Sequence, residues 1–151
     1  MVQLRDYAPE DFDRLWALDQ ECFAPQIAYS PKELRLFITS PRGLTVVAEE
    51  DGEIAGFLVA SLEKNKLAHI ITIDVRAESR GCGVGQALMH ETERRFKEKH
   101  AVAIALEVAV DNSPAVKFYT KLGYTVLDRL PRYYQTGADG LLMGKKLVAK
   151  L

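Results

Sequence analysis

The chain has 151 residues, of which 48% are hydrophobic, and a formal net charge of −1. This size and composition predict one globular domain with a hydrophobic core, spanning residues 1–151. The balanced charge argues against nucleic-acid binding, because non-specific binding requires a basic surface. The two cysteines form no CxxC pair and there are three histidines, so no metal site is visible.

The sequence also bears on location. Residues 1–6 have no apolar signal core, and no run approaches the roughly 18 apolar residues that a membrane span requires. Two free thiols suit a reducing compartment. We therefore expect a cytoplasmic protein that binds no membrane.

Turn and capping residues mark the elements of the first half. Ser30, Pro31 and Glu33 occupy the N-cap, N1 and N3 positions of a helix. Asp51 and Gly52 stand between two runs rich in β-formers, which is typical of a hairpin. The predicted elements are a strand at 2–7, helices at 9–22 and 30–39, and strands at 44–49, 53–62 and 67–75.

In the second half, the elements are predicted from hydrophobic periodicity and from a glycine that ends a helix. Gly123 is placed to end a short helix as its C′ residue. The predicted elements are helices at 84–100 and 113–122 and strands at 102–110, 124–134 and 141–147. The order β-α-α-β-β-β-α-β-α-β-β predicts a mixed α/β (α+β) sheet in one domain.

A glycine-rich turn links the strand that ends at Val75 to the helix that begins near Val84. Helix N-termini carry free N–H groups and partial positive charge, which stabilise a diphosphate placed there. Gly81, Gly83 and Gly85 let the backbone approach such a group closely. The turn has no Gly-Lys-Ser/Thr and no G-x-G-x-x-G spacing, which excludes a P-loop and a dinucleotide fold.

The pattern Arg-x-x-Gly-x-Gly at residues 80–85 resembles the acyl-CoA signature of the GNAT (GCN5-related N-acetyltransferase) superfamily. The element order also matches over nearly the whole chain. The resemblance implies a single-domain GNAT fold with a mostly antiparallel sheet of about seven strands and about four helices, splayed at the central parallel strands to hold acetyl-CoA. Its implied acetyl-CoA residues are Ile73, Asp74, Val75, Arg80, Gly81, Gly83, Val84, Gly85, Gln86, Asn112 and Tyr119.

A second segment, residues 106–124, is similar to the companion motif of this superfamily. A strand is followed by Asn112, which is placed to cap a short helix carrying Tyr119. The spacing of Glu107, Asn112 and Tyr119 resembles the ribosomal-protein alanine acetyltransferase type. That resemblance implies Glu107 as general base and Tyr119 as general acid.

Both roles fit the chemistry. An α-amino group with a pKa of roughly 8 must lose a proton before it attacks a thioester, and a carboxylate within reach can accept it. A phenol near the sulfur can protonate the departing thiolate. The oxyanion would be held by a strand N–H, for which Val75 is the candidate.

Two aromatic loops resemble the acceptor loops of the same type, one between the first two helices and one before the last strand. The candidate acceptor residues are Phe23, Pro25, Ile27, Tyr29, Tyr133 and Tyr134. They favour the N-terminus of a protein or peptide, with a ribosomal protein as one candidate. Acetylation of a small amine, or a non-catalytic acyl-CoA-binding module, are the alternatives. We expect a monomer or weak homodimer, with acetyl-CoA as co-substrate and no metal.

Overall fold

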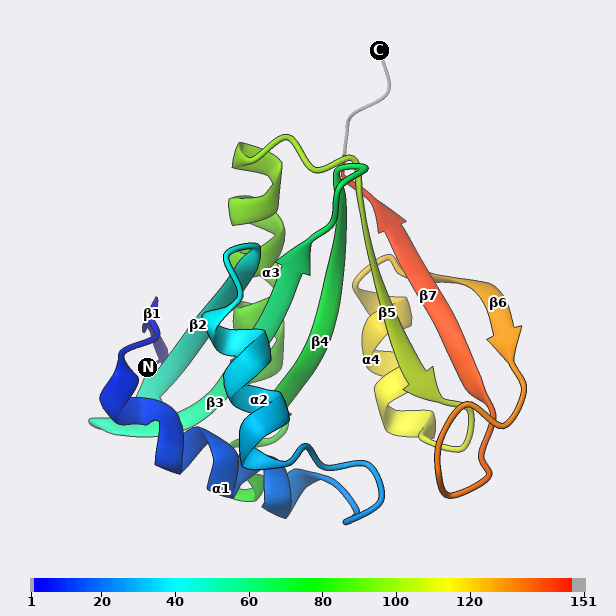
Figure 1. Cartoon of the computed structure of the whole chain (residues 1–151). Helices are drawn as coiled ribbons and strands as arrows, with labels where there is room; N and C mark the ends of the chain where they lie inside the picture. The colour runs from blue at the N-terminus through cyan, green and yellow to red at the C-terminus, as the bar shows by residue number, and fades with distance from the viewer. Residues whose placement is uncertain (1, 148–151) are drawn as a thin grey trace.

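The structure, a computed structural model, describes residues 2–147 and contains one seven-stranded sheet. The strand order is β1-β2-β3-β4-β5-β7-β6 (Figure 1). The strands are β1 (Val2–Asp6), β2 (Gly43–Glu50), β3 (Glu53–Leu62), β4 (Leu67–Val75), β5 (Ala103–Ala109), β6 (Thr125–Leu130) and β7 (Gly140–Lys146). The helices are α1 (Phe12–Cys22), α2 (Pro31–Thr39), α3 (Val84–Glu98) and α4 (Ser113–Lys121), with 3-10 turns η1 (Pro9–Asp11) and η2 (Ala77–Ser79).

The sheet is split at its centre, between β4 and β5. These strands form the one parallel pair among the described residues, and their register covers only the rungs from Leu67↔Ala103 to His69↔Ala105. A register shift against β3 follows, with Ala60 opposite Ile70 and Val59 opposite Thr72, so that β4 bulges and bends. Beyond the bulge β4 pairs with β3 alone and diverges from β5 (Figure 1).

Helices cover both faces of the sheet. In Figure 1, α1 and α2 lie in front of it, and α3 and α4 lie behind. The front layer buries Phe12, Leu15 and Leu18 of α1, whereas Leu88 and Phe96 of α3 lie in the larger cluster behind. Between residues 2 and 147, none of these helices is long and apolar enough to cross a membrane.

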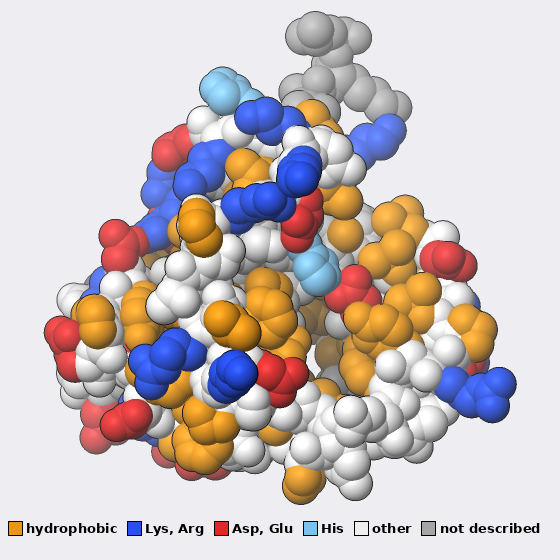
Figure 2. Space-filling view, in the orientation of Figure 1, with side chains coloured by type: hydrophobic (Ala, Val, Ile, Leu, Met, Phe, Trp, Pro, Cys, Tyr) orange, Lys and Arg blue, Asp and Glu red, His pale blue; other side chains and the backbone are white. Residues whose placement is uncertain are grey.

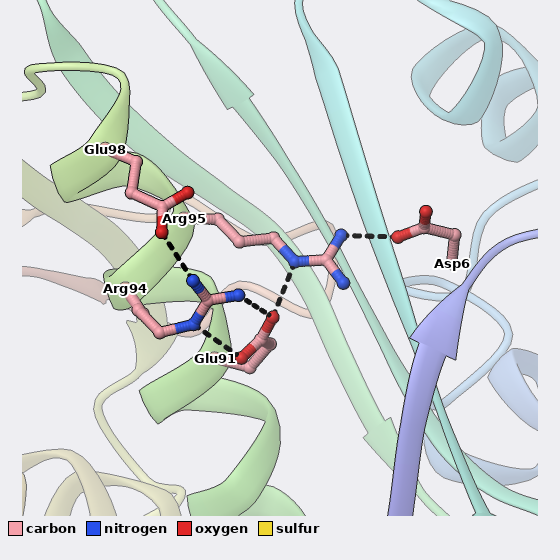
Figure 3. Close-up of polar contacts among 5 residues, drawn as sticks. All are labelled: Asp6, Glu91, Arg94, Arg95 and Glu98. Atoms are coloured by element: carbon pink, nitrogen blue, oxygen red, sulfur yellow. Dashed lines mark hydrogen bonds and ion pairs between the residues drawn. The ribbon is translucent and has the colours of Figure 1, made fainter.

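Helix α3 is tied to the first half of the split sheet by ion pairs (Figure 3). Glu91 accepts hydrogen bonds from Arg94 and Arg95 at 2.7 Å each, and the Arg95 guanidinium also donates to Asp6 of β1 at 2.6 Å. The two guanidinium groups lower the pKa of Glu91 to about 2, against burial that would raise it. The network therefore persists over the working pH range.

The same helix is tied to the second half through Glu93. This carboxylate is 5% exposed and accepts hydrogen bonds from the Tyr124 hydroxyl at 2.8 Å and from Lys145 Nζ at 2.9 Å. Lys145 also donates to the carbonyl of Leu122 at the end of α4. Helix α3 thus holds the two halves of the sheet in a fixed relation.

The predicted order of elements is confirmed, but two predicted ends are wrong. The strand predicted at 124–134 ends at Leu130, because Pro131 has no N–H to donate and Arg132 adopts a left-handed φ of 48°. Tyr133 and Tyr134 consequently lie in a loop. The helix predicted to end at 100 ends at Glu98, where His100 also turns to a left-handed φ of 65°.

Candidate active site

A cavity of about 240 Å³ opens where β4 and β5 diverge. Figure 2 shows the hollowed middle of the face that carries α1 and α2. The cavity is lined by both strand edges, by α4 and by two aromatic loops. The predicted site residues that line it are Phe23, Ile27, Tyr29, Ile73, Glu107, Asn112, Tyr119, Tyr133 and Tyr134.

The donor edge of this cavity is formed by backbone groups of β4. The amide of Arg76 donates to the carbonyl of Ala55 on β3 at 2.9 Å. Because peptide groups alternate along a strand, those of Ile73 and Val75 face the split. The carbonyl of Val75 accepts from Arg80 Nε at 3.1 Å and from the Cys22 thiol at 3.5 Å. Beyond His69 this edge has no β5 partner, so an extended chain can pair with its peptide groups other than the Val75 carbonyl.

The turn below β4 has the geometry of an anion cradle. Gly81 and Gly83 have φ values of 77° and 88°, and a Cβ on either would meet no described atom within 4 Å. The first helical hydrogen bond of α3 runs from Ala87 N to Gly83 O, so the amides of residues 84–86 precede it and have no helical acceptor. Open space above orphan donors fits a diphosphate.

Two neighbours complete the turn. A Cβ on Gly85 would lie 3.1 Å from the Phe118 ring of α4, so Gly85 allows α3 and α4 to approach. The Arg80 side chain does not extend over the glycine turn. Its guanidinium turns back to the Val75 carbonyl, and its Nη2 lies 3.6 Å from the Cys22 Sγ. Cys82 is exposed beside it.

Asp74 lies away from the cavity. Its Cα pairs with Phe57 of β3, and it is 1% exposed. Its carboxyl accepts a hydrogen bond from the Thr72 hydroxyl at 2.6 Å. The Asp74 side chain is therefore buried within the fold and does not line the cavity.

Helix α4 brings a phenol to the back of the cavity. Tyr119 is 7% exposed and packs edge-on against Phe118 and Tyr124, with ring centroids 5.2 and 6.0 Å away. Burial raises the pKa of Tyr119 far above its ordinary value, and Asp74 and Tyr134 add to the shift. The phenol is therefore protonated at any working pH. Asn112 accepts from Ala115 N at 3.3 Å and so caps α4 while lining the cavity.

Glu107 meets a residue that the sequence reasoning missed. His69 Nε2 lies 2.7 Å from Glu107 Oε1, and both side chains are partly buried. The hydrogen bond to Glu107 raises the pKa of His69, against burial that would lower it. The contact follows from the register of the parallel strands. His69 stands opposite Ala105 at the last paired position, and Glu107 follows two residues later on the same face of β5.

The loop between α1 and α2 places Tyr29 on the front wall. Its carbonyl accepts from Trp16 Nε1 at 3.1 Å and from Gln20 Nε2 at 2.8 Å, and its hydroxyl donates to the carbonyl of Ile71 at 3.4 Å. Burial raises the pKa of Tyr29 to about 12. Pro25 is exposed and stands apart from the cavity lining.

The loop between β6 and β7 supplies the opposite wall. Tyr133 and Tyr134 pack edge-on with ring centroids 4.9 Å apart. Asp139 fixes the loop, because its carboxylate accepts from Arg129 Nε at 2.7 Å and from Arg132 N at 2.9 Å. Both tyrosines therefore reach the cavity from a braced loop.

A second cavity, of about 580 Å³, continues the first across the front face. The two share Tyr29, Ile71, Glu107 and Tyr133 as lining residues. The second extends past His69 to Arg42 and Glu63, whose charged groups lie 3.6 Å apart. Together they form one groove that runs from Tyr119 to Arg42.

Comparison with known proteins identifies the family. The acetyltransferase (GNAT) family model matches residues 12–124. This chain belongs to the GNAT family. An N-alpha-acetyltransferase of Sulfurisphaera tokodaii is 35% identical over 113 residues, which are 67% of this chain and 68% of that protein. A Bacillus subtilis protein provisionally named a ribosomal protein bS18-alanine N-acetyltransferase is 29% identical over 93% of this chain and 92% of that protein.

The ribosomal-protein-S18-alanine N-acetyltransferase of Escherichia coli has the same fold as this GNAT chain. Its crystal structure superposes with a TM-score of 0.90 at 20% identity, covering 100% of this chain and 97% of that one. The predicted fold and the resemblance to the ribosomal-protein type are confirmed. The protein is an acetyl-CoA-dependent N-acetyltransferase. Within residues 2–147, no group of three or more His, Cys, Asp or Glu is arranged to hold a metal.

Proposed function

We propose that this enzyme transfers the acetyl group of acetyl-CoA to the N-terminal α-amine of a protein or peptide, with a ribosomal protein as the first candidate. The observation that carries the proposal is the continuous groove. Its two cavities meet at Tyr29, Glu107 and Tyr133, so an amine placed beside Glu107 leaves room for the chain behind it. The names of the related proteins, which act on N-termini or on a ribosomal protein, support the same acceptor.

The donor side follows from the split sheet. The amides of residues 84–86 hold the diphosphate of acetyl-CoA at the start of α3. The peptide groups of Ile73 and the N–H of Val75 pair with the pantetheine arm, as an added strand would. This places the thioester between Glu107 and Tyr119, at the narrow end of the split. The N–H of Val75 remains the candidate donor to the oxyanion.

Proton transfer is divided between two side chains. Glu107 accepts the proton of the incoming ammonium, and the free amine attacks the thioester carbonyl. A C–N bond forms, the C–S bond breaks, and Tyr119 donates its proton to the departing thiolate. The second proton that the nitrogen loses on forming the amide returns to the Tyr119 phenolate, and Glu107 releases its proton to solvent. His69 orients Glu107 through its 2.7 Å contact. A protonated His69 would hold Glu107 in an ion pair, and Glu107 would then not accept the proton of the amine. Proton transfer to Glu107 therefore requires a neutral His69.

The acceptor is tested with matched amines. We expect a tetrapeptide with a free N-terminus to be acetylated with a kcat/KM at least about tenfold above that of a polyamine, because only the peptide fills the groove. A second tetrapeptide, with a blocked N-terminus and one lysine, is the control for ε-amine acetylation. Mass spectrometry locates the acetyl group, and CoA release measures the rate.

Two outcomes would contradict the proposal. A polyamine preferred over every peptide would indicate a small-molecule acetyltransferase. Tight acetyl-CoA binding without turnover on any amine would indicate a binding module.

Glu107→Gln should lower turnover by about 10²–10⁴-fold if Glu107 is the base, while acetyl-CoA affinity stays near that of the parent enzyme.

A further inference from the structure

Two carboxyl groups that the catalytic scheme does not use are buried between α1 and β4. Asp19 is 0% exposed and Asp74 is 1% exposed. Neither forms an ion pair with a cation among residues 2–147. An isolated ionised carboxylate in such surroundings is strongly disfavoured. An ionised Asp74 is therefore disfavoured in the folded protein.

The two side chains interact, because Asp19 raises the pKa of Asp74. Asp19 Oδ1 and Asp74 Oδ2 are both buried, and neither has a hydrogen-bond partner among residues 2–147. Carboxylate oxygens only accept, so a bond between them requires a proton on one of the two groups. Burial, together with Asp19, raises the pKa of Asp74 well above its ordinary value, so Asp74 retains its proton to higher pH than an exposed carboxyl group.

The outer oxygens of the pair connect the two sides of the active site. Asp19 Oδ2 accepts from the backbone amide of Tyr29 at 2.9 Å. Asp74 Oδ1 accepts from the hydroxyl of Thr72 at 2.6 Å. The two carboxyl groups thus stand between the wall of the acceptor groove and the strand whose edge faces the donor. Trp16 and Gln20 hold the carbonyl of Tyr29 from the same helix.

The other titratable groups around the pair leave it without a counter-ion. The Cys22 thiol lies near Asp74 and has a pKa raised by burial. The phenols of Tyr29 and Tyr119 also have raised pKa values, and so both are neutral. The Arg80 guanidinium contacts the Cys22 thiol and donates to the Val75 carbonyl.

We propose that Asp19 and Asp74, joined by a shared proton, form a positioning pair that locks Tyr29 of the acceptor groove to strand β4. Loss of the proton sets two buried negative charges against each other and releases Tyr29. The acceptor groove then loosens, whereas the glycine turn that holds the diphosphate is unaffected. The effect on acceptor affinity rests on the proposed function, but the lock itself does not.

The sign of the pH dependence follows from the raised pKa of Asp74. The folded protein holds the proton more tightly than the unfolded chain. The stabilising contribution of the bond is therefore complete below the ordinary carboxyl range and is lost as pH rises through the raised value. We expect KM for the acceptor to rise on the alkaline side while KM for acetyl-CoA stays level.

The test uses Asp19→Asn, whose amide reproduces the bond without a shared proton. Its oxygen can accept from Tyr29 N and its NH₂ can donate to Asp74. We expect this variant to lose the alkaline rise in acceptor KM. Asp19→Ala breaks the chain and should raise acceptor KM about tenfold at every pH, with acetyl-CoA KM unchanged. Asp13→Asn, which removes an exposed charge from α1, is the matched control and should behave as the parent.

A second readout needs no acceptor. The chain has a single tryptophan, and Trp16 donates to the carbonyl of Tyr29 at 3.1 Å, so its fluorescence reports on the lock. The parent should show an alkaline fluorescence transition that Asp19→Asn lacks. The same transition in both proteins would overturn the lock. A fluorescence difference without any peptide acetylation would retain the lock and refute the proposed acceptor instead.

Discussion

Replacing Gly83 by alanine should weaken acetyl-CoA binding far more than it weakens folding. Gly83 has a φ of 88°, and an L-residue in the left-handed region costs about 1–2 kcal/mol. For a domain of this size, each kcal/mol lowers Tm by about 2–4 °C. We therefore expect Tm to fall by about 2–8 °C, with the protein folded at 25 °C.

The effect on the cofactor is larger because the new methyl group occupies the open space above the amides of residues 84–86. A diphosphate displaced from even one charge-assisted hydrogen bond loses about 1.5–3 kcal/mol. That loss corresponds to a rise of about 10- to 150-fold in KM for acetyl-CoA. KM for the acceptor should stay within about twofold, because the groove does not contact the turn.

Gly52→Ala is the matched control. Gly52 has a φ of 79°, and a Cβ added there would meet no described atom within 4 Å, so its backbone strain is the same. It lies in the turn between β2 and β3, outside the glycine turn. Steady-state kinetics and thermal melts of both variants separate strain from cofactor binding. Equal rises of the acetyl-CoA KM in the two variants, or none in Gly83→Ala, would refute the cradle.

Three further predictions concern other residues. Tyr119→Phe should lower kcat by about 10²–10⁴-fold without changing the calorimetric affinity for acetyl-CoA, and an unchanged kcat would remove its role as acid. The acceptor kcat/KM should rise with pH through an apparent pKa above the ordinary histidine value of about 6.5, because Glu107 raises the pKa of His69; His69→Gln should abolish that limb, and its persistence would assign the limb elsewhere. Lys145→Met should destabilise the fold by about 2–4 kcal/mol in urea melts, since it leaves buried Glu93 with Tyr124 alone; unchanged stability would contradict that link.

Local signals predicted most of the fold. The capping box of Ser30 and Glu33 is present in both directions, and Asp51 and Gly52 both adopt the positive φ that a tight hairpin requires. Such features depend on a few neighbouring residues, so a short stretch of sequence determines them. The end of β6 was missed although Pro131 was visible, because apolar alternation was extended across a strand breaker.

The pairings that cross the sheet could not be predicted in the same way. The contact of His69 with Glu107 requires the register of two strands that are joined by a whole helix. The proposed bond between Asp19 and Asp74 depends on which face of β4 Asp74 occupies after the bulge, and a shift of one residue would turn Asp74 to the other face. The contacts of a long side chain could not be predicted either. Arg80 could reach several acceptors, and in the structure it donates to the Val75 carbonyl and contacts the Cys22 thiol.

Because β4 and β5 splay apart, the edge proposed to bind acetyl-CoA and the proposed base Glu107 lie beside the same gap. Pairing ends at His69 and Ala105, and the next residues on each strand lose their partners on the facing side. On β4 this frees the peptide groups that face the donor, and on β5 it places Glu107 just past the last rung. Helix α3 holds the gap open, because Arg95 ties it to β1 and Glu93 ties it to β7. A variant that loosens either tie should therefore alter donor and acceptor KM together, which distinguishes it from changes at the glycine turn or at Asp19.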